Sequence, residues 1–156
     1  MTGLAIAIFG VALCAALAGC GSAIGVMAAG KAAAGVTSQK PELFGKLLVL
    51  QALPGTQGIY GFLTAILIMV RLGLLGGSPL DISDTVGWQF FFAALPMGLC
   101  GLISGIAQGK TAVAAIHLTG KQPDAAGKGI TMTALVETYA ILALLISILL
   151  VFGVTL

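Results

Sequence analysis

Glu137 is the residue best placed to do chemistry, because it stands inside the apolar run "ALVETYAIL" at 134–142. Two glutamines lie at a similar distance from Pro41 or Pro123, the prolines of the two short loops. Glu137 follows Pro123, Gln108 precedes Pro123 and Gln57 follows Pro41, each at nearly the same spacing. This spacing of about 14 to 16 residues corresponds to about 21 to 24 Å along a helix that rises about 1.5 Å per residue. The sequence therefore predicts a polar cluster at one level.

More oxygen donors are expected near Gln57. Leu53, Gln57 and Tyr60 follow an i, i+4, i+7 spacing, which predicts one helix face, and Thr56 lies beside them. Pro54 cannot donate a backbone hydrogen bond, and with the glycine that follows it we expect a kink that loosens nearby carbonyls. A free carbonyl of this kind is a potential ligand.

The charge of Glu137 must be neutralised. An ionised carboxylate in hydrocarbon costs several kcal/mol unless it is paired, and we expect no Lys or Arg at its level. Glu137, Thr56, Gln57, Gln108 and one backbone carbonyl would offer about five oxygens with one negative charge, the ligand type that hard cations prefer. Because a single carboxylate balances a monovalent ion, sodium fits best.

Two other interpretations of Glu137 stay open. A bare proton site would need only the carboxylate and one hydrogen-bond partner, so two glutamines at the same depth would be surplus. In a purely structural role, a protonated Glu137 would be hydrogen-bonded to Gln57 and would hold two helices together.

The elements that must position these residues are membrane-spanning helices. Of the 156 residues, 59% are hydrophobic and 8% charged, and the mean hydropathy of +1.15 is far above that of soluble domains. Four apolar stretches, about 4–34, 43–75, 88–118 and 127–156, can each cross a hydrocarbon core of about 30 Å. We predict an all-α membrane protein with four transmembrane helices.

The four helices are expected to be two copies of one hairpin. "QKPELFGK" at 39–46 matches "KQPDAAGK" at 121–128, which brings Pro41 onto Pro123 and defines a repeat offset. The same offset pairs six further positions without a gap: Leu13 with Leu95, Leu17 with Leu99, Gly19 with Gly101, Ser22 with Ser104, Ile24 with Ile106 and Ala52 with Ala134. This predicts two parallel hairpins, 1–78 and 79–156. Glu137 corresponds to Gly55, so the ion-binding acid stands in the second copy only, one per chain.

Charge and side-chain size predict the placement of the helices. Lysines surround the first and third loops, whereas the second loop carries Asp81 and Asp84 with only Arg71 nearby. By the positive-inside rule, the first and third loops are cytoplasmic and both termini lie outside. The first and third helices are rich in small residues, which suits a crowded inner layer, and the second and fourth carry larger side chains suited to lipid. Glycine stripes alone would indicate only tight packing.

Several other features are expected to have no separate function. Cys14, Cys20 and Cys100 lie in apolar segments without metal-ligand spacing and are interpreted as packing residues, and His117 as an interfacial residue. "LAGC" at 17–20 is like a lipoprotein cleavage box but follows no charged segment, so we expect no cleavage. The net charge of +2 gives no reason to expect nucleic acid as a partner. We find neither a phosphate-binding loop nor a catalytic triad in the sequence, so we do not expect the chain itself to be an enzyme.

The motifs "LPGTQGIYGF" (53–62), "SGIAQGK" (104–110) and "VETYAIL" (136–142) carry a family resemblance that covers nearly the whole chain. The chain resembles the four-helix membrane rotor subunit (proteolipid, K or c subunit) of V-type rotary ATPases, most of all the bacterial sodium-translocating kind. The resemblance implies hydrogen bonding of Tyr60 to Glu137. It implies sodium coordination by the Leu53 carbonyl, the Thr56 hydroxyl, the Gln57 and Gln108 side-chain carbonyls and the Glu137 carboxylate.

The resemblance also implies partners. These are identical subunits in a two-layered ring surrounded by lipid, a stator membrane subunit of the a or I type whose arginine meets Glu137, central-stalk subunits, and a soluble ATPase head that hydrolyses ATP. The chain would be a non-catalytic, multi-pass subunit in the bacterial plasma membrane. A proton-translocating rotor of the same fold, and a channel or purely structural membrane protein, are the alternatives.

Overall fold

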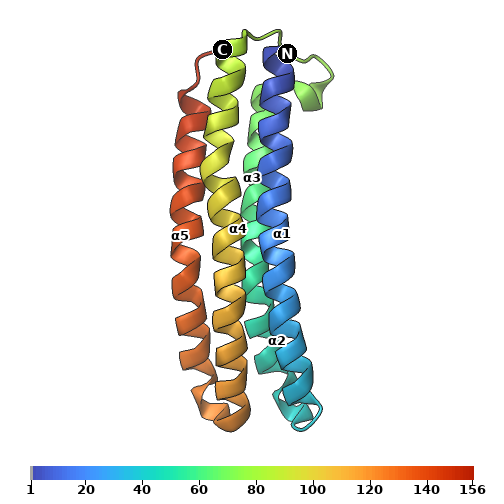
Figure 1. Cartoon of the computed structure of the whole chain (residues 1–156), viewed down its shortest axis with the longest axis vertical. Coiled ribbons are helices and arrows are strands. Elements are labelled where there is room, and N and C mark those ends of the chain that lie inside the picture. The colour runs from blue at the N-terminus through green and yellow to red at the C-terminus, as the bar shows by residue number, and fades with distance from the viewer. Residues whose placement is uncertain (1) are drawn as a thin grey trace.

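The structure is a computed structural model that describes residues 2–156, and every regular element in this range is helical. Four long helical segments run side by side (Figure 1). Each is long and apolar enough to cross a membrane, as predicted from the sequence. Their bounds are Gly3–Thr37 for α1, Pro41–Arg71 for the segment that contains α2 and α3, Asp84–Lys121 for α4, and Pro123–Gly153 for the segment that contains α5.

The ends of these helices differ from the predicted stretches for local reasons. α4 begins at Asp84, earlier than predicted, because the Ser83 side chain caps it by accepting a hydrogen bond from the Val86 amide at 3.4 Å. The second segment ends at Arg71 rather than near residue 75. Gly73 follows with a left-handed φ of 70°, a conformation that stops a helix and that glycine adopts without steric cost.

The second segment is interrupted at Pro54, as the sequence predicted. α2 (Phe44–Ala52) is followed by a 3₁₀ turn, Leu53–Gly55, and then by α3 (Thr56–Arg71). In this turn the Thr56 amide bonds to the Leu53 carbonyl instead of reaching one residue further back. Proline lacks the amide that would continue the regular ladder, so the backbone tightens here.

α1 and α4 approach each other closely because glycines line their contact. A Cβ added to Gly105 would lie 2.7 Å from the carbonyl carbon of Gly21, and one added to Gly21 would lie 2.6 Å from Cα of Leu102. Real side chains are not found at such distances, so these positions require glycine. Small residues at helix contacts are the usual means of close packing in a membrane, where apolar side chains gain nothing by leaving lipid.

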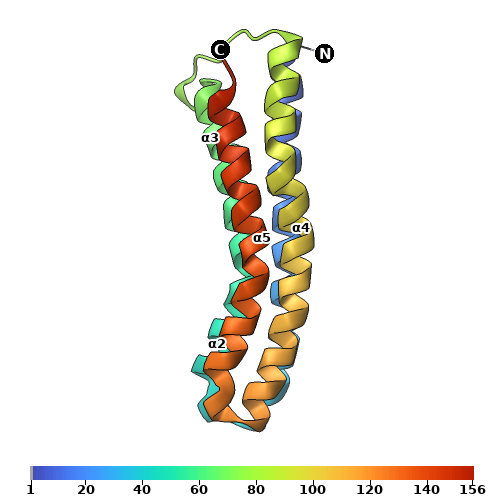
Figure 2. The same ribbon diagram turned by 90° about the vertical axis from the view of Figure 1, so that its left-hand side faces the viewer.

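The four segments form two layers within the chain. Figure 2 shows α1 and α4 on one side, and α2, α3 and α5 (Ala126–Gly153) on the other. α5 packs mainly against α4, and α3 packs mainly against α1. The predicted separation of small-residue helices from large-residue helices is therefore present within one chain. α3 and α5 contact each other less than each contacts its main partner, and the hydrogen bond between Tyr60 and Glu137 crosses their boundary.

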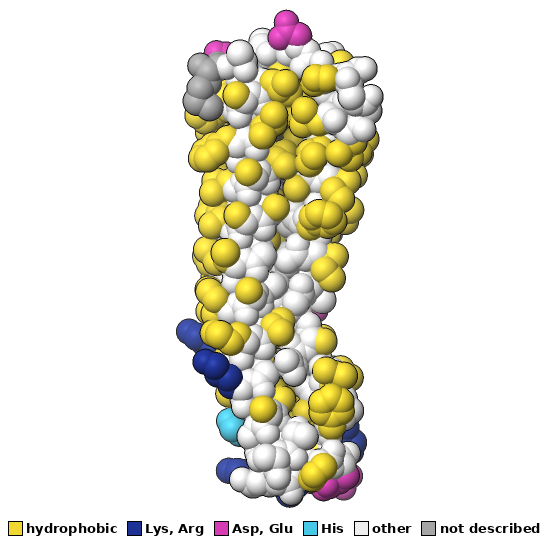
Figure 3. All heavy atoms as spheres, turned by 90° about the vertical axis from the view of Figure 1, so that its right-hand side faces the viewer, with side chains coloured by type: hydrophobic (Ala, Val, Ile, Leu, Met, Phe, Trp, Pro, Cys, Tyr) yellow, Lys and Arg dark blue, Asp and Glu magenta, His cyan; other side chains and the backbone are white. Residues whose placement is uncertain are grey.

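The two ends of the bundle differ in their connections. Figure 1 shows both termini and the link between α3 and α4 at one end, and the tight turns after α1 and α4 at the other. Lys and Arg side chains gather toward the end of the tight turns on the face drawn in Figure 3, below a largely hydrophobic surface. This is the topology of two parallel hairpins.

Candidate ion-binding site

Glu137 lies in the middle of α5, and its half-buried carboxylate contacts side chains from two other helices. The Tyr60 hydroxyl of α3 donates a hydrogen bond to Oε1 at 2.5 Å. Gln108 of α4 donates from Nε2 to Oε2 at 3.5 Å. The hydrogen bond between Tyr60 and Glu137 that the family resemblance implies is present, and three helices meet at one carboxylate.

The two glutamines lie together at this level, as the spacing from the prolines predicted. Gln57 of α3 and Gln108 of α4 are both completely buried. Gln57 donates from Nε2 to Oε1 of Gln108, and Gln108 donates from Nε2 to the Thr133 carbonyl of α5 at 3.2 Å. Buried amides need such partners, because an unpaired polar group in an apolar interior is costly. Each amide oxygen accepts one described hydrogen bond and has a second lone pair, but Gln108 directs Nε2 rather than its oxygen toward Glu137.

Thr56 and Leu53 add one oxygen each at the 3₁₀ turn. The Thr56 hydroxyl donates to the Leu53 carbonyl at 3.0 Å and lies 3.4 Å from Oε1 of Gln57. These separations are those of hydrogen bonds, and three oxygens this close together could also be ligands of one cation, at distances of about 2.3 to 2.6 Å in the case of Ca²⁺. The Leu53 carbonyl is less free than predicted, because it also accepts the Thr56 amide. For Leu53 to act as a ligand, the Thr56 hydroxyl must turn its hydrogen away.

Ser104 belongs to this cluster, although the sequence did not point to it as a site residue. Its hydroxyl accepts a hydrogen bond from Nε2 of Gln57 at 3.1 Å and donates to the Val136 carbonyl at 3.2 Å. It therefore joins α3, α4 and α5 beside the glutamines. The available signal was its position four residues before Gln108, which places both side chains on one face of α4.

Lys110 shares the depth of Glu137, contrary to the expectation that no basic residue does. Pro123 stands almost midway between the two in sequence, so both side chains lie at about the same distance along their helices from that turn. Lys110 is exposed, whereas Gln108 two residues earlier is fully buried. Two residues turn a helix by about 200°, so the two side chains point to opposite sides of α4. The lysine lies at the level of the site but on the other face.

A carboxylate inside a membrane-spanning helical bundle marks an ion pathway in many membrane proteins. Such a site defines a class of ion-carrying membrane proteins. The model of the ATP synthase C-subunit family matches this chain twice, at residues 9–68 and 91–150, and the two matches are related by the repeat offset. The chain belongs to this family, whose c and K proteolipids are the non-catalytic membrane rotor subunits of rotary ATPases.

Individual relatives agree with this assignment. The chain is 49% identical to the V-type sodium ATPase subunit K of Enterococcus hirae, over 96% of this chain and 92% of that protein. It is 42% identical to the A-type ATP synthase subunit K of Methanocaldococcus jannaschii, over 93% of this chain and 61% of that protein. It is 33% identical to the 16 kDa proteolipid of the V-type proton ATPase of Ascaris suum, over 60% of this chain and 58% of that protein.

Proposed function

We propose that this chain is the rotor subunit of a sodium-translocating V-type ATPase and that it carries one sodium ion per chain at Glu137. The observation that supports this most directly is the composition of the cluster. The Glu137 carboxylate contacts the buried amide of Gln108, and a chain of contacts continues from Gln108 through the amide of Gln57 and the hydroxyl of Thr56 to the Leu53 carbonyl. A bare proton would use only the carboxylate and one partner, whereas this set suits a hard monovalent cation.

The proposed ligands are the carbonyl of Leu53, the hydroxyl of Thr56, the side-chain oxygens of Gln57 and Gln108, and the carboxylate of Glu137. Tyr60 would hold the carboxylate in place through the hydrogen bond at 2.5 Å. The names of the relatives favour sodium, because the relative with 49% identity belongs to a sodium ATPase. The proteolipid of the proton ATPase is less similar and matches a smaller part of this chain.

In the proposed assembly, identical chains form a ring with α1 and α4 inside and with α3 and α5 facing lipid and a stator subunit. The ring lies in the bacterial plasma membrane, with the two tight turns in the cytoplasm and both termini outside. Glu137 takes sodium from a channel that is open to the cytoplasm. Bound sodium neutralises the carboxylate, which lowers the cost of carrying it past lipid.

Release would follow when an arginine of the stator competes with sodium for Glu137. A central stalk driven by a soluble ATPase head would turn the ring. Moving one charge against a membrane potential of about 100 mV costs about 2.3 kcal/mol. With one site in every four helices instead of every two, a ring of given circumference moves fewer ions in each turn. The energy of one turn is then divided among fewer ions, so each ion can be moved against a steeper gradient.

Carbodiimide labelling of the purified ring tests this proposal. The reagent modifies a protonated carboxyl, so sodium that occupies the site should protect Glu137 from labelling. We expect protection by millimolar sodium, stronger at higher pH because sodium and a proton compete for the same carboxylate. Mass spectrometry of the peptide that contains Glu137 measures the modification directly, and Glu137→Gln is the control that must remain unlabelled there.

The other interpretations predict different results. Labelling of Glu137 that does not respond to sodium would identify a proton rotor. Absence of labelling at Glu137 under all conditions would reject the ion site. Retention of ATP-coupled transport by Glu137→Gln would favour a channel or a structural protein over a rotor.

A further inference from the structure

α1 and α4 carry a row of basic side chains that extends from the level of Glu137 to the tight turns. On α4, Lys110, His117 and Lys121 follow one another at intervals of seven and four residues, which places them on one face of the helix. Lys31 of α1 is the fourth member of this basic row. All four side chains are exposed in the single chain, and Figure 3 shows Lys and Arg gathered on this half of the molecule.

Three members of the basic row meet in a groove between α1 and α4. The groove is lined by Lys31, Gln39 and Lys40 on one side and by His117 and Lys121 on the other. Of the described residues that line it, none is acidic. Nζ of Lys40 donates to the carbonyl of Gly120 at 2.6 Å, which holds this lysine at the rim. The groove therefore concentrates positive charge.

The helix ends explain two of these lysines but not the others. Carbonyls at the C-terminus of a helix attract cations within the last turn, where Lys121 lies and where Lys40 donates its hydrogen bond. Lys31 stands ten residues before Pro41, and Lys110 stands thirteen before Pro123. These spacings correspond to about 15 and 20 Å along the helices. Lys31 and Lys110 thus lie beyond the last turns, at depths inside the membrane.

An ammonium group at such a depth needs a partner of opposite charge or water. A lone charge in hydrocarbon costs several kcal/mol. Between the tight turns and the level of Glu137, neither α1 nor α4 carries an acidic residue. Glu137 itself lies on α5, in the other layer. The two helices that carry the basic row therefore offer it no counter-ion.

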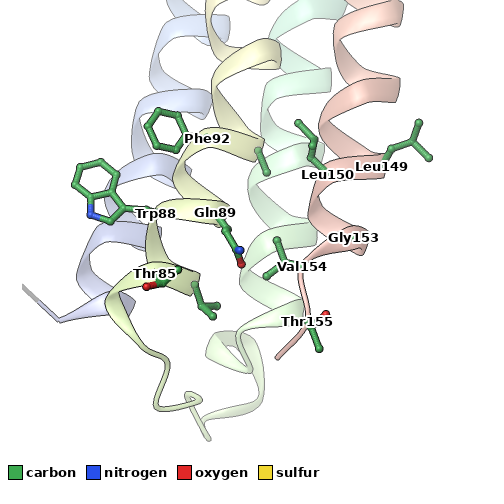
Figure 4. A pocket seen from close by; sticks show the side chains of 11 residues that line it. Thr85, Trp88, Gln89, Phe92, Leu149, Leu150, Gly153, Val154 and Thr155 are labelled. Carbon is green, nitrogen blue, oxygen red and sulfur yellow. The ribbon is translucent and has the colours of Figure 1, made fainter.

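Further from the tight turns, the same faces are apolar. Met27 precedes Lys31 by one turn on α1, Ile103 precedes Lys110 by two turns on α4, and both are more than half exposed. Another groove, near the outer end of α4, is lined by neutral residues such as Trp88 (Figure 4). The positive charge on these helices is confined to the half of the bundle that ends in the tight turns.

We propose that the groove between α1 and α4 is a binding site for a phosphate group, which Lys31, His117 and Lys121 contact. Lysine offers three donors on a point charge, and hydrogen bonds between ionised partners are stronger than neutral ones. Basic pockets between membrane helices are suited to anionic head groups in the same way. The phosphate group comes either from the head of an anionic lipid or from a free ion. This inference rests on the membrane-spanning fold and not on sodium binding at Glu137.

Acetylation of lysines in the purified ring tests the site. A small water-soluble reagent should modify Lys31 and Lys121, and mass spectrometry of their peptides measures each reaction. We expect phosphatidylglycerol in the detergent micelles, or inorganic phosphate, to protect both lysines. The diacylglycerol with the same acyl chains lacks phosphate and should not protect them, nor should potassium chloride at matched ionic strength. Lys128 is exposed on α5 outside the groove, so it serves as the internal control.

The pattern of protection identifies the source of the phosphate group. Protection by both probes would show that a free phosphate ion is sufficient. Protection by phosphatidylglycerol alone would identify a lipid head group whose acyl chains contribute through apolar residues such as Met27 and Ile103.

Substitutions test the named residues. Lys31→Gln should raise the probe concentration for half-protection of Lys121 about ten- to hundredfold, because a hydrogen bond between ionised groups is lost. Lys31→Arg keeps the charge and should retain the protection. Lys128→Gln is the matched control, which removes one lysine outside the groove and should leave the protection of Lys121 unchanged.

A phosphate group that stays bound during purification would make the lysines unreactive from the start. Phosphorus analysis of the washed ring covers this case. The double variant Lys31→Gln with Lys121→Gln should then contain less phosphorus per chain than the unchanged protein.

Three results would overturn the proposal. One is equal protection by phosphatidylglycerol and by the diacylglycerol. Another is a set of reactive groove lysines that neither phosphate probe protects more than Lys128. The third is a set of unreactive groove lysines with no difference in phosphorus between the double variant and the unchanged protein. Protection of Glu137 by sodium is measured separately, so the proposed function would stand in each case.

Discussion

The hydroxyl of Tyr60 is the only group on α3 that donates a described hydrogen bond to Glu137. A hydrogen bond to a charged group contributes about 1.5 to 3 kcal/mol, and here it also fixes the direction of the carboxylate. Tyr60→Phe keeps the ring and removes this donor. We expect the sodium concentration for half-protection of Glu137 against carbodiimide to rise about ten- to hundredfold. Tyr139→Phe is the matched control, because Tyr139 is 68% exposed on the same helix as Glu137. Equal shifts in both variants would contradict the assigned role.

Ser104 offers a smaller test of the same cluster. Ser104→Ala leaves Nε2 of Gln57 with Gln108 as its one remaining acceptor. A neutral hydrogen bond contributes about 0.5 to 1.5 kcal/mol, so sodium affinity should fall about two- to tenfold. Ser22→Ala is the control, since Ser22 is the sister of Ser104 but accepts a hydrogen bond from the backbone amide of Gly58 at 2.7 Å. Sodium titration of labelling compares the two, and a larger loss in Ser22→Ala would count against this assignment.

Individual residues show why the sequence predicted part of the site and not all of it. Depth follows from counting residues along a helix, so the shared level of Gln57, Gln108 and Glu137 was predictable. The direction of a side chain depends on the angle around the helix and on which neighbour packs there. The role of Ser104 depends on that direction and was not predictable from the sequence. The depth of Lys110 follows from the same counting, whereas its exposure on the face opposite Gln108 is seen only in the structure.

At the scale of the elements, the contact between α1 and α4 holds the two repeats together. Gly105→Ala places a Cβ against the backbone of Gly21 and Ser22, where no flexible group can move away. Overpacking of this kind costs about 1 to 3 kcal/mol. We expect a lower temperature of ring dissociation in detergent. Gly45→Ala in α2 is the control, because a Cβ there meets nothing within 4 Å. An unchanged dissociation temperature in Gly105→Ala would show that the helices are less tightly packed than described.

The number, order and type of the elements were predictable because four long apolar stretches have few alternatives in a membrane. Their ends were less predictable. Hydropathy does not register a serine cap such as Ser83, nor a glycine such as Gly73 whose left-handed φ ends a helix. The break at Pro54 was predictable in position, but its form as a 3₁₀ turn that still engages the Leu53 carbonyl depends on the local backbone path.

At the scale of the whole molecule, the residues of the candidate site are divided between the two copies of the hairpin. The second copy supplies the carboxylate of Glu137, while the first copy supplies Thr56, Gln57 and Tyr60 from the equivalent helix. Neither hairpin holds the complete cluster, so the site depends on both copies being packed together. The boundaries of the hairpins, at residues 78 and 79, stay a prediction.

The tight turn and loop connections of this chain also set an arithmetic rule for any ring that it forms. Because two hairpins enter the ring on one polypeptide, the total number of hairpins must be even, whatever the number of chains. Carboxylates can then stand only at every second hairpin, so the angular interval between successive ion-carrying positions is twice the interval between hairpins. As the ring turned, the stator would meet hairpins with a carboxylate and hairpins without one in alternation. Each ion-carrying step would therefore move the ring by two hairpins.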